Sequence, residues 1–340
     1  MDLTIFTRNI SNPVREKTII KKRPDTGAFA VMLQKEMADH IRSWRFIIMI
    51  SLIVLTFIAA MYASLSNIKS ATGNSHDPNL NFLYLKLLTA TDNSIPPFHI
   101  FLSFLAPLLG ISLGFDAINS ERNSGTLIRL MAQPVYRDNL LLAKFSSALL
   151  IIGCLFVTLT LLMIGAGLLL MGVSMEPQEL FRIMGFVFVT ITYVAFWLCM
   201  SMLLSIVFRQ AATSAITAIG LWLFFTIFYQ LIVNLVLKSV LPDASQLTQE
   251  QAISYNEMVL NILRVSPNQL YTDAVTTMLM PSVRSLGPLT MEQMAGAIPS
   301  PLPFAQSLML VWPQLSGLLA ATTGCFALGY YLFMRREIRS

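Results

Sequence analysis

The chain has 340 residues, of which 55% are hydrophobic and only 12% are charged, and its mean hydropathy is +0.66. Because soluble proteins carry about 25% charged residues, this composition excludes a soluble globular protein and indicates an integral membrane protein. The net charge of +5 is therefore read as a signal of membrane orientation, and nucleic acid is not an expected partner.

The N-terminal part divides into a basic tail and an amphipathic segment. Residues 1–27 are polar and basic, and no apolar core of about 7–15 residues follows the charges closely enough for a cleavable signal. We interpret them as a cytoplasmic tail, with a regulatory or membrane-touching role as the alternative. Within 28–45, apolar and charged side chains alternate at helical spacing, which predicts a helix lying in the membrane interface.

Six apolar runs follow, and each is long enough to cross a bilayer, which takes about 20 residues. They cover Phe46–Leu65, Phe98–Ile118, Phe145–Gly172, Ile183–Phe208, Thr213–Leu237 and Leu308–Met334. The predicted fold is therefore an all-α integral membrane protein with six transmembrane helices. Seventeen of the 23 Lys and Arg residues fall on the side that holds both termini, which the positive-inside rule assigns to the cytoplasm.

Two longer polar segments, 66–96 and 238–305, fall on the extracytoplasmic side. Asn79–Ala90 has the pattern of a short helix, and the second segment has helical patterns over Thr248–Arg264 and from Pro267 to about Met278. The second segment is either a compact cap over the outer mouth or a contact surface for an extracytoplasmic protein. The last residues, 335–340, form a basic tail that we expect in the cytoplasm.

The stretch Asp116–Lys144 is a polar island between the second and third runs. It holds four basic residues, Arg122, Arg129, Arg137 and Lys144, which place it in the cytoplasm. Gly125 and Pro134 bracket a short helical segment. Three apolar side chains recur there at i, i+3 and i+4: Leu127, Leu130 and Met131. A short helix with an exposed apolar face and basic neighbours predicts a surface that docks into a partner protein.

Ten residues of this island form a motif: Glu121, Arg122, Gly125, Thr126, Leu127, Gln133, Pro134, Val135, Arg137 and Lys144. The motif resembles the first cytoplasmic loop of type-2 ABC exporter permeases, such as those of multidrug, bacteriocin and nitrous oxide reductase maturation systems. The six spans and the preceding interfacial helix fit the same family. The resemblance implies a permease domain over 46–334, in which loop 119–144 contains a coupling helix that sits in a groove of an ATP-binding subunit.

The resemblance also implies that the second and fifth spans line the translocation path. The candidate residues are Phe101, Phe104 and Pro107, together with Phe224, Phe225 and Phe228. Pro107 predicts a kink, which either lines a cavity or reflects irregular packing, and the aromatic residues can equally be packing contacts. An apolar lining would suit a hydrophobic or amphipathic substrate, because no buried charge is evident in the spans.

The chain shows no pattern typical of an enzyme. It contains no Gly-Lys dipeptide and therefore no phosphate-binding loop, so ATP and Mg²⁺ are expected on the partner subunit and no cofactor on this chain. Cys154, Cys199 and Cys325 lie in apolar runs without metal or redox spacing. Asp116 is the deepest ionisable candidate, and we expect it to reach Arg122 or a backbone donor.

Three functions remain open from the sequence. The first is the membrane subunit of an ABC exporter that works with a nucleotide-binding subunit and a second permease copy, homo- or heterodimeric, in the cell membrane. The second keeps the fold but transmits force to an extracytoplasmic partner without cargo. The third, an intramembrane enzyme or a channel, is disfavoured because the spans lack acid and base groups and the coupling-loop motif is present.

Overall fold

The structure, a computed structural model, describes residues 27–72, 82–90, 95–131, 137–172, 175–240, 258–281 and 302–335. The described part is helical and contains no strand. Its elements are α1 (Ala28–Arg42), α2 (Trp44–Thr72), α3 (Leu83–Thr89), α4 (Phe98–Gly114), α5 (Asn119–Asn123), α6 (Thr126–Met131), α7 (Arg137–Met171), α8 (Pro177–Val207), α9 (Ala211–Leu223), the π-helix η2 (Phe224–Phe228), α10 (Tyr229–Val240), α12 (Pro267–Leu279) and α14 (Phe304–Arg335).

The six predicted spans are confirmed. Six helices of the described part are long and apolar enough to cross a membrane: Trp44–Ile68, Phe98–Asn123, Asp138–Met171, Pro177–Val207, Ala211–Leu237 and Phe304–Arg335. The helix expected over 28–45 is α1. The tail before residue 27, most of segment 238–305 and residues 336–340 lie outside the described residues, so the predictions for them stay predictions.

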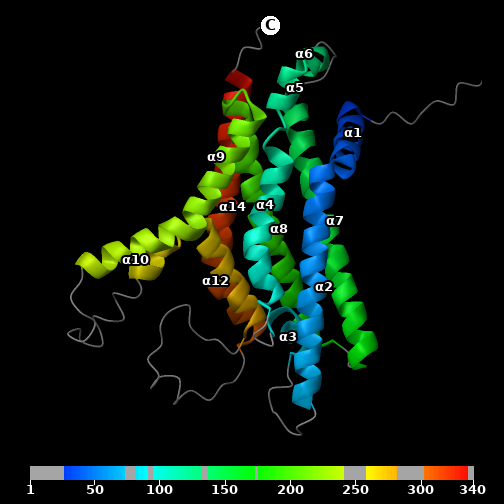
Figure 1. Cartoon of the computed structure of the whole chain (residues 1–340), viewed down its shortest axis with the longest axis vertical. Coiled ribbons are helices and arrows are strands. Elements are labelled where there is room, and N and C mark those ends of the chain that lie inside the picture. The colour runs from blue at the N-terminus through cyan, green and yellow to red at the C-terminus, as the bar shows by residue number, and fades with distance from the viewer. Residues whose placement is uncertain are drawn as a thin grey trace, which may run out of the picture.

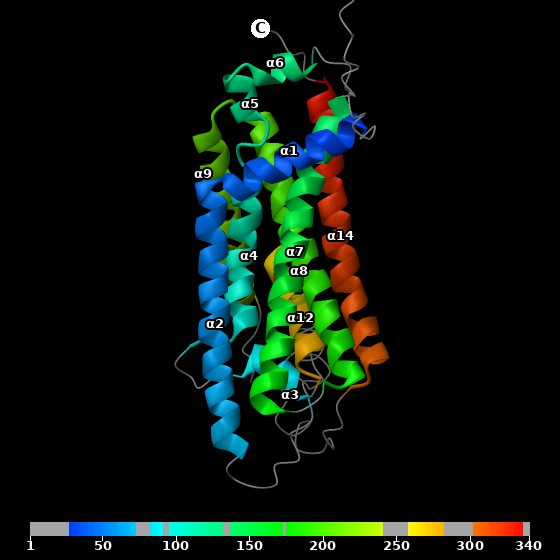
Figure 2. The same cartoon turned by 90° about the vertical axis from the view of Figure 1, so that its right-hand side faces the viewer.

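The long helices stand side by side, and the short elements gather at the two ends (Figure 1). At one end α1 lies across the bundle beside α5 and α6, as the turned view shows (Figure 2). At the other end α3 and α12 pack against the spans. We name these the α1–α6 end and the α3–α12 end. Helix α14 finishes at the α1–α6 end (Figure 1).

The bundle is organised around the close packing of α4 on α8, and α8 is the most buried span. Gly110 and Gly114 lie one helical turn apart on α4. A Cβ at Gly110 would lie 2.7 Å from the carbonyl oxygen of Val194, and one at Gly114 would lie 2.8 Å from that of Leu198. Small residues four apart let helix backbones approach closely in membranes, which explains this contact. Helix α4 runs through the buried Pro107 as one element.

The fifth span is not one regular helix, because η2 interrupts it and α10 leaves the bundle sideways (Figure 1). A π-turn disturbs the regular backbone hydrogen bonding, and residues near α12 stabilise the bend. Ser266 Oγ donates to the carbonyl oxygen of Phe225 at 3.0 Å, and the Tyr229 hydroxyl donates to that of Ile262 at 2.6 Å. The sequence pattern of Thr213–Leu237 gave no sign of this break.

The α3–α12 end contains a fully buried arginine, Arg182 on α8. Its Nη1 donates to the carbonyl oxygen of Met278 at 3.2 Å and to Ser307 Oγ at 3.1 Å, and its Nη2 donates to the carbonyl oxygen of Leu302. The guanidinium also lies 5.9 Å from the ring centre of Phe82. The expectation that the spans offer no buried charge was therefore wrong. The described part of segment 238–305 packs into the bundle here, through buried residues of α12.

Candidate functional site

The site lies at the α1–α6 end, where the loop from α4 to α7 is anchored to α8. The backbone N–H groups of Ile118 and Asn119 both donate to Ser205 Oγ, at 3.0 and 3.2 Å. Further along, Asn123 Nδ2 donates to the carbonyl oxygen of Arg209 at 3.0 Å, in the turn between α8 and α9. These contacts fix α5 to the most buried span, so a displacement of α5 is opposed by the core of the bundle.

A tight turn then redirects the chain into α6. Gly125 has a φ of +70°, in the left-handed region that L residues with side chains avoid. No atom would lie within 4 Å of an added Cβ, so the requirement for glycine is one of backbone conformation. The hydroxyl groups of Ser124 and Thr126 each donate to the carbonyl oxygen of Glu121 at 3.2 Å. The turn therefore sets the direction of α6 relative to α5.

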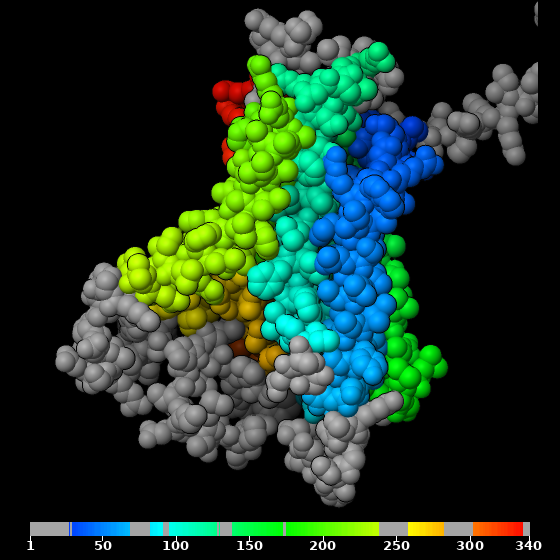
Figure 3. Space-filling view, viewed as in Figure 1, coloured from blue at the N-terminus to red at the C-terminus, as the bar shows by residue number. Residues whose placement is uncertain are grey.

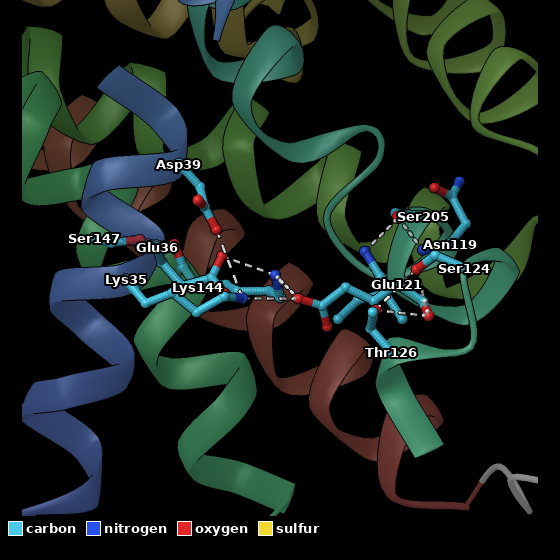
Figure 4. A network of polar contacts seen from close by, with 11 residues as sticks. Lys35, Glu36, Asp39, Asn119, Glu121, Ser124, Thr126, Lys144, Ser147 and Ser205 are labelled. Atoms are coloured by element: carbon cyan, nitrogen blue, oxygen red, sulfur yellow. Dashed lines mark hydrogen bonds and ion pairs between the residues drawn. The ribbon is translucent and has the colours of Figure 1, made fainter. Parts of the chain in front are cut away.

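A buried ammonium group, that of Lys144 on α7, connects three separate elements (Figure 4). Its Nζ lies 2.8 Å from Glu36 Oε2 on α1 and 2.8 Å from Glu121 Oε1 on α5. Lys35 on α1 joins the same cluster, at 3.0 Å from Glu36 and 3.7 Å from Glu121, and it also lies 3.6 Å from Asp39. We call these five residues the Lys144 cluster.

The electrostatics of the Lys144 cluster favour its charged state. Burial alone would raise the pKa of Glu36, but Lys144 and Lys35 outweigh burial and hold this pKa below its ordinary value. For Lys35, burial would lower the pKa, and the carboxylates of Glu36, Glu121 and Asp39 outweigh burial, so the pKa is raised. Both shifts mean that the ion pairs are favourable in the folded protein. Helices α1, α5 and α7 are therefore linked by charge.

A cavity of about 760 Å³ opens beside this cluster. It lies between α1, the first turn of α2, the end of α4, the α5–α6 loop and α7. Asp116 lines it and pairs with Arg45 at the start of α2, whose guanidinium lies 4.7 Å from the ring centre of Phe115. Arg45, rather than the expected Arg122, is thus the partner of Asp116. This ion pair between α2 and the turn after α4 supplements the links made by Lys144.

The model of the protein family described as "ABC-2 family transporter protein" matches residues 30–338 of this chain. This chain belongs to the ABC-2 transporter family. A protein of Pseudomonas aeruginosa named probable ABC transporter permease protein NosY is 27% identical over 202 residues, which are 58% of this chain and 66% of that protein. A protein of the same name from Stutzerimonas stutzeri is 26% identical over 316 residues, which are 89% of this chain and 96% of that protein.

The family membership confirms the resemblance drawn from the coupling motif. The chain is an ABC-2 permease subunit and a multi-pass membrane protein, of a class that is not itself catalytic. ABC permeases in general work with an ATPase partner and in a dimeric arrangement. The geometry at the α1–α6 end is therefore the geometry of an ABC-2 permease loop and its surroundings.

The structure places the predicted coupling residues in different environments. Thr126 and Arg129 are exposed, whereas Glu121 and Arg122 are half-buried. Leu127 is only 3% exposed and joins the hydrophobic core, so its assignment to an exposed apolar face was wrong. It instead anchors α6, because burying a leucine side chain stabilises by about 2 kcal/mol. Pro134 and the side chains of Leu130, Met131 and Arg137 lie outside the described part.

The two groups of predicted path residues lie on α4 and on η2. Phe104, Phe224 and Phe228 are exposed, Phe101 and Phe225 are half-buried, and Pro107 is buried. Within the second group, the rings of Phe224 and Phe225 lie 5.4 Å apart, edge to face. No ring contact joins the α4 group to the η2 group among the described residues. Their shared role in translocation stays a prediction.

The sequence interpretation missed the links that hold this site together. It placed Glu36 on the polar face of α1, but this carboxylate is buried against α7. Lys144 was assigned a charge on the cytoplasmic side and a place in the coupling motif, but no partner. A signal existed, since Lys144 follows the apolar residues Leu140–Ala143 at the start of a span, and a charge in such a run usually has a partner. The partner carboxylate, that of Glu36, lies 108 residues away along the chain, so local spacing cannot identify it.

Proposed function

We propose that this permease couples ATP hydrolysis on a separate nucleotide-binding subunit to outward movement of a hydrophobic or amphipathic substrate. In this proposal the α1–α6 end and both termini face the cytoplasm, α6 docks on the ATPase, and ATP and Mg²⁺ bind to that subunit. A second permease copy completes the complex in the cell membrane. The Lys144 cluster is the observation that supports this proposal most directly.

The support comes from how the loop is connected. Helix α6 follows α5, and α5 is bonded to α8 through Ser205 and to α1 and α7 through Glu121. A push on α6 therefore reaches α1, α7 and α8 through short polar contacts. Contacts of this kind hold discrete positions, so a displacement at the loop moves whole helices.

The proposed substrate class follows from the surfaces of the second and fifth spans. Phe104 on α4 and Phe224 and Phe228 on η2 expose their rings. The fifth span is the least buried of the six, and its π-turn η2 carries the exposed Phe224 and Phe228. Residues in π-turns are frequent at functional sites. An exposed aromatic surface between movable helices would accept an apolar or amphipathic molecule.

Two glycines offer a matched test of coupling. Gly125 at the α6 turn and Gly172 at the opposite end have φ values of +70° and +67°, and both have open space for a side chain. Gly125→Val and Gly172→Val should therefore cost similar stability, about 1–2 kcal/mol each. We expect only Gly125→Val to reduce capture of a phosphate-loop ATPase in mild detergent and the ATPase activity of the complex. Equal behaviour of the two variants would contradict the docking of α6.

A further inference from the structure

The cavity at the α1–α6 end lies where two membrane spans end, which is the level expected for lipid headgroups. Trp44 and Arg45 line it from the N-terminal turn of the first span, and Ser112 and Asp116 line it from the C-terminal part of the second span. Trp44 is 75% exposed, and tryptophan at the start of a span is typical of the membrane–water interface. The volume of about 760 Å³ falls within the range of small-molecule sites, about 300–1,000 Å³.

The charges around this cavity are balanced in number but separated in space. Four basic and four acidic residues line it: Lys35, Arg45, Arg129 and Lys144, with Glu36, Asp39, Asp116 and Glu121. On the α1–α7 side, three carboxylates of the Lys144 cluster share two ammonium groups. On the α6 side, Arg129 is exposed and has no ion pair among the described residues. The cavity thus has an acid-rich side and a free guanidinium.

The acid-rich side still lacks a hydrogen-bond donor. Glu121 Oε1 is bound by Lys144, but Oε2 is enclosed and has no hydrogen-bond partner among the described atoms. An enclosed carboxylate oxygen without a donor is costly. A primary ammonium brings three N–H donors, whereas a trimethylammonium brings none. Asp39, which is exposed at the cavity and pairs with Lys35 at 3.6 Å, adds a second acceptor there.

Apolar surface descends from the cavity along two packed helices. On α2 and α4, apolar residues that are partly or fully exposed recur at helical spacing: Trp44, Ile48, Leu52 and Leu55 on α2, with Phe104 and Leu108 on α4. Leu55, two turns or more below the cavity, is 67% exposed. The two helices lie side by side on one open face (Figure 3). A molecule with a charged head in the cavity could lay its acyl chains on this face.

We propose that this cavity binds the headgroup of a primary-amine phospholipid from the adjacent leaflet. Arg129 contacts the phosphate, because a guanidinium matches phosphate oxygens well. The ammonium lies on the acid-rich side, near Glu121 and Asp39. The acyl chains follow α2 and α4. The proposal concerns binding alone and does not rest on transport or on the ATPase.

Native mass spectrometry of the full-length chain tests this binding. The protein would be purified in mild detergent with equimolar phosphatidylethanolamine, phosphatidylcholine and phosphatidylglycerol. We expect phosphatidylethanolamine to be retained about tenfold over the other two, the change that one charged hydrogen bond makes. Arg129→Gln should weaken the retention of all three lipids, because each carries the phosphate, whereas Asp39→Asn should remove the preference for phosphatidylethanolamine. Arg42→Gln, an exposed arginine of α1 outside the cavity, is the matched control and should keep it.

Two further measurements distinguish a lipid from a soluble metabolite as the ligand, and a lipid site from a protein interface. Soluble phosphoethanolamine or inorganic phosphate that binds as tightly as the lipid would show a free metabolite site and overturn the proposal. Equal retention of the three lipids, or equal behaviour of Arg129→Gln and Arg42→Gln, would overturn it too. If Arg129→Gln loses ATPase capture but retains all three lipids as the wild type does, the cavity belongs to a protein interface and the proposal is wrong.

Discussion

The permease buries one cation at each end of its helix bundle, and the two are held in different ways. Lys144 at the α1–α6 end lies between two carboxylates, from α1 and α5. Arg182 at the α3–α12 end is surrounded by neutral oxygens, two of them backbone carbonyl groups and one a hydroxyl. No carboxylate pairs with Arg182 among the described residues. Ion pairs therefore surround Lys144, whereas neutral dipoles surround Arg182.

This difference has a mechanical consequence. The Lys144 cluster borders an open cavity, and its three carboxylates come from two helices, α1 and α5, so moving one of these helices can exchange an ion pair for water. Arg182 is fully buried, and any separation from its acceptors leaves a charge without solvation. The α1–α6 end is thus suited to change its contacts, whereas the α3–α12 end is suited to stay closed.

The largest expected effect is at Arg182. Arg182→Met keeps much of the side-chain volume but leaves buried carbonyl oxygens of α12 and of the chain before α14 without donors. We expect a loss of about 3–5 kcal/mol in unfolding free energy, because three buried acceptors lose their donor at about 1–3 kcal/mol each. Thermal unfolding in detergent measures it, with the exposed Arg42→Met as the control. A change no larger than that of the control would show that the arginine does not hold this end together.

The effect at Lys144 should be smaller. Lys144→Met leaves Glu36 and Glu121 without their shared ammonium, but Lys35 remains near both. We expect a loss of about 2–3 kcal/mol in unfolding free energy. The triple variant Glu36→Gln/Glu121→Gln/Lys144→Met should recover part of this loss, because it removes the unpaired charges. No recovery in the same unfolding assay would mean that Lys144 contributes by packing rather than by charge.

The smallest effect is a dependence on pH that only one end should show. The pKa of Glu36 is lowered in the folded protein, so its contribution to stability is complete above its ordinary value of 4.5 and is lost as the pH falls through the lower, folded pKa. The coupling energy between Glu36→Gln and Lys144→Met should therefore shrink between pH 7 and about pH 3. The cost of Arg182→Met should not follow this titration. An unchanged coupling energy would contradict the charged state of Glu36.

Much of the fold could be predicted from the sequence, because membrane spans are long apolar runs whose length is set by the bilayer. The short α12 could be predicted as well, since Ser266 and Pro267 mark its start. The break at Phe224–Phe228 could not, because it depends on Ser266 and Tyr229 meeting backbone groups far along the chain. The spacing of apolar residues predicts a helical span, but it does not show which backbone carbonyl groups accept hydrogen bonds from side chains such as Ser266 and Tyr229.

The site was predictable to a lesser extent. The turn at Gly125 could be expected, since glycine between polar residues favours a sharp change of direction. The burial of Leu127 could not, because three apolar residues on a short helix look alike until the core beneath one of them is known. Arg182 directly precedes the span predicted from Ile183, a position at which a charge normally reaches water. Its acceptors lie about 100 residues away and cannot be found by local spacing.

The most direct test of the account is where the ATPase touches the permease. A photoreactive amino acid would replace Leu130 on α6, and in a second variant Phe181, which is exposed near the opposite end of the bundle. After irradiation of intact membranes, we expect an adduct with a protein that carries a phosphate-binding loop at position 130 and none at position 181. An absent adduct at 130, with the protein folded and inserted, would contradict the coupling role of α6.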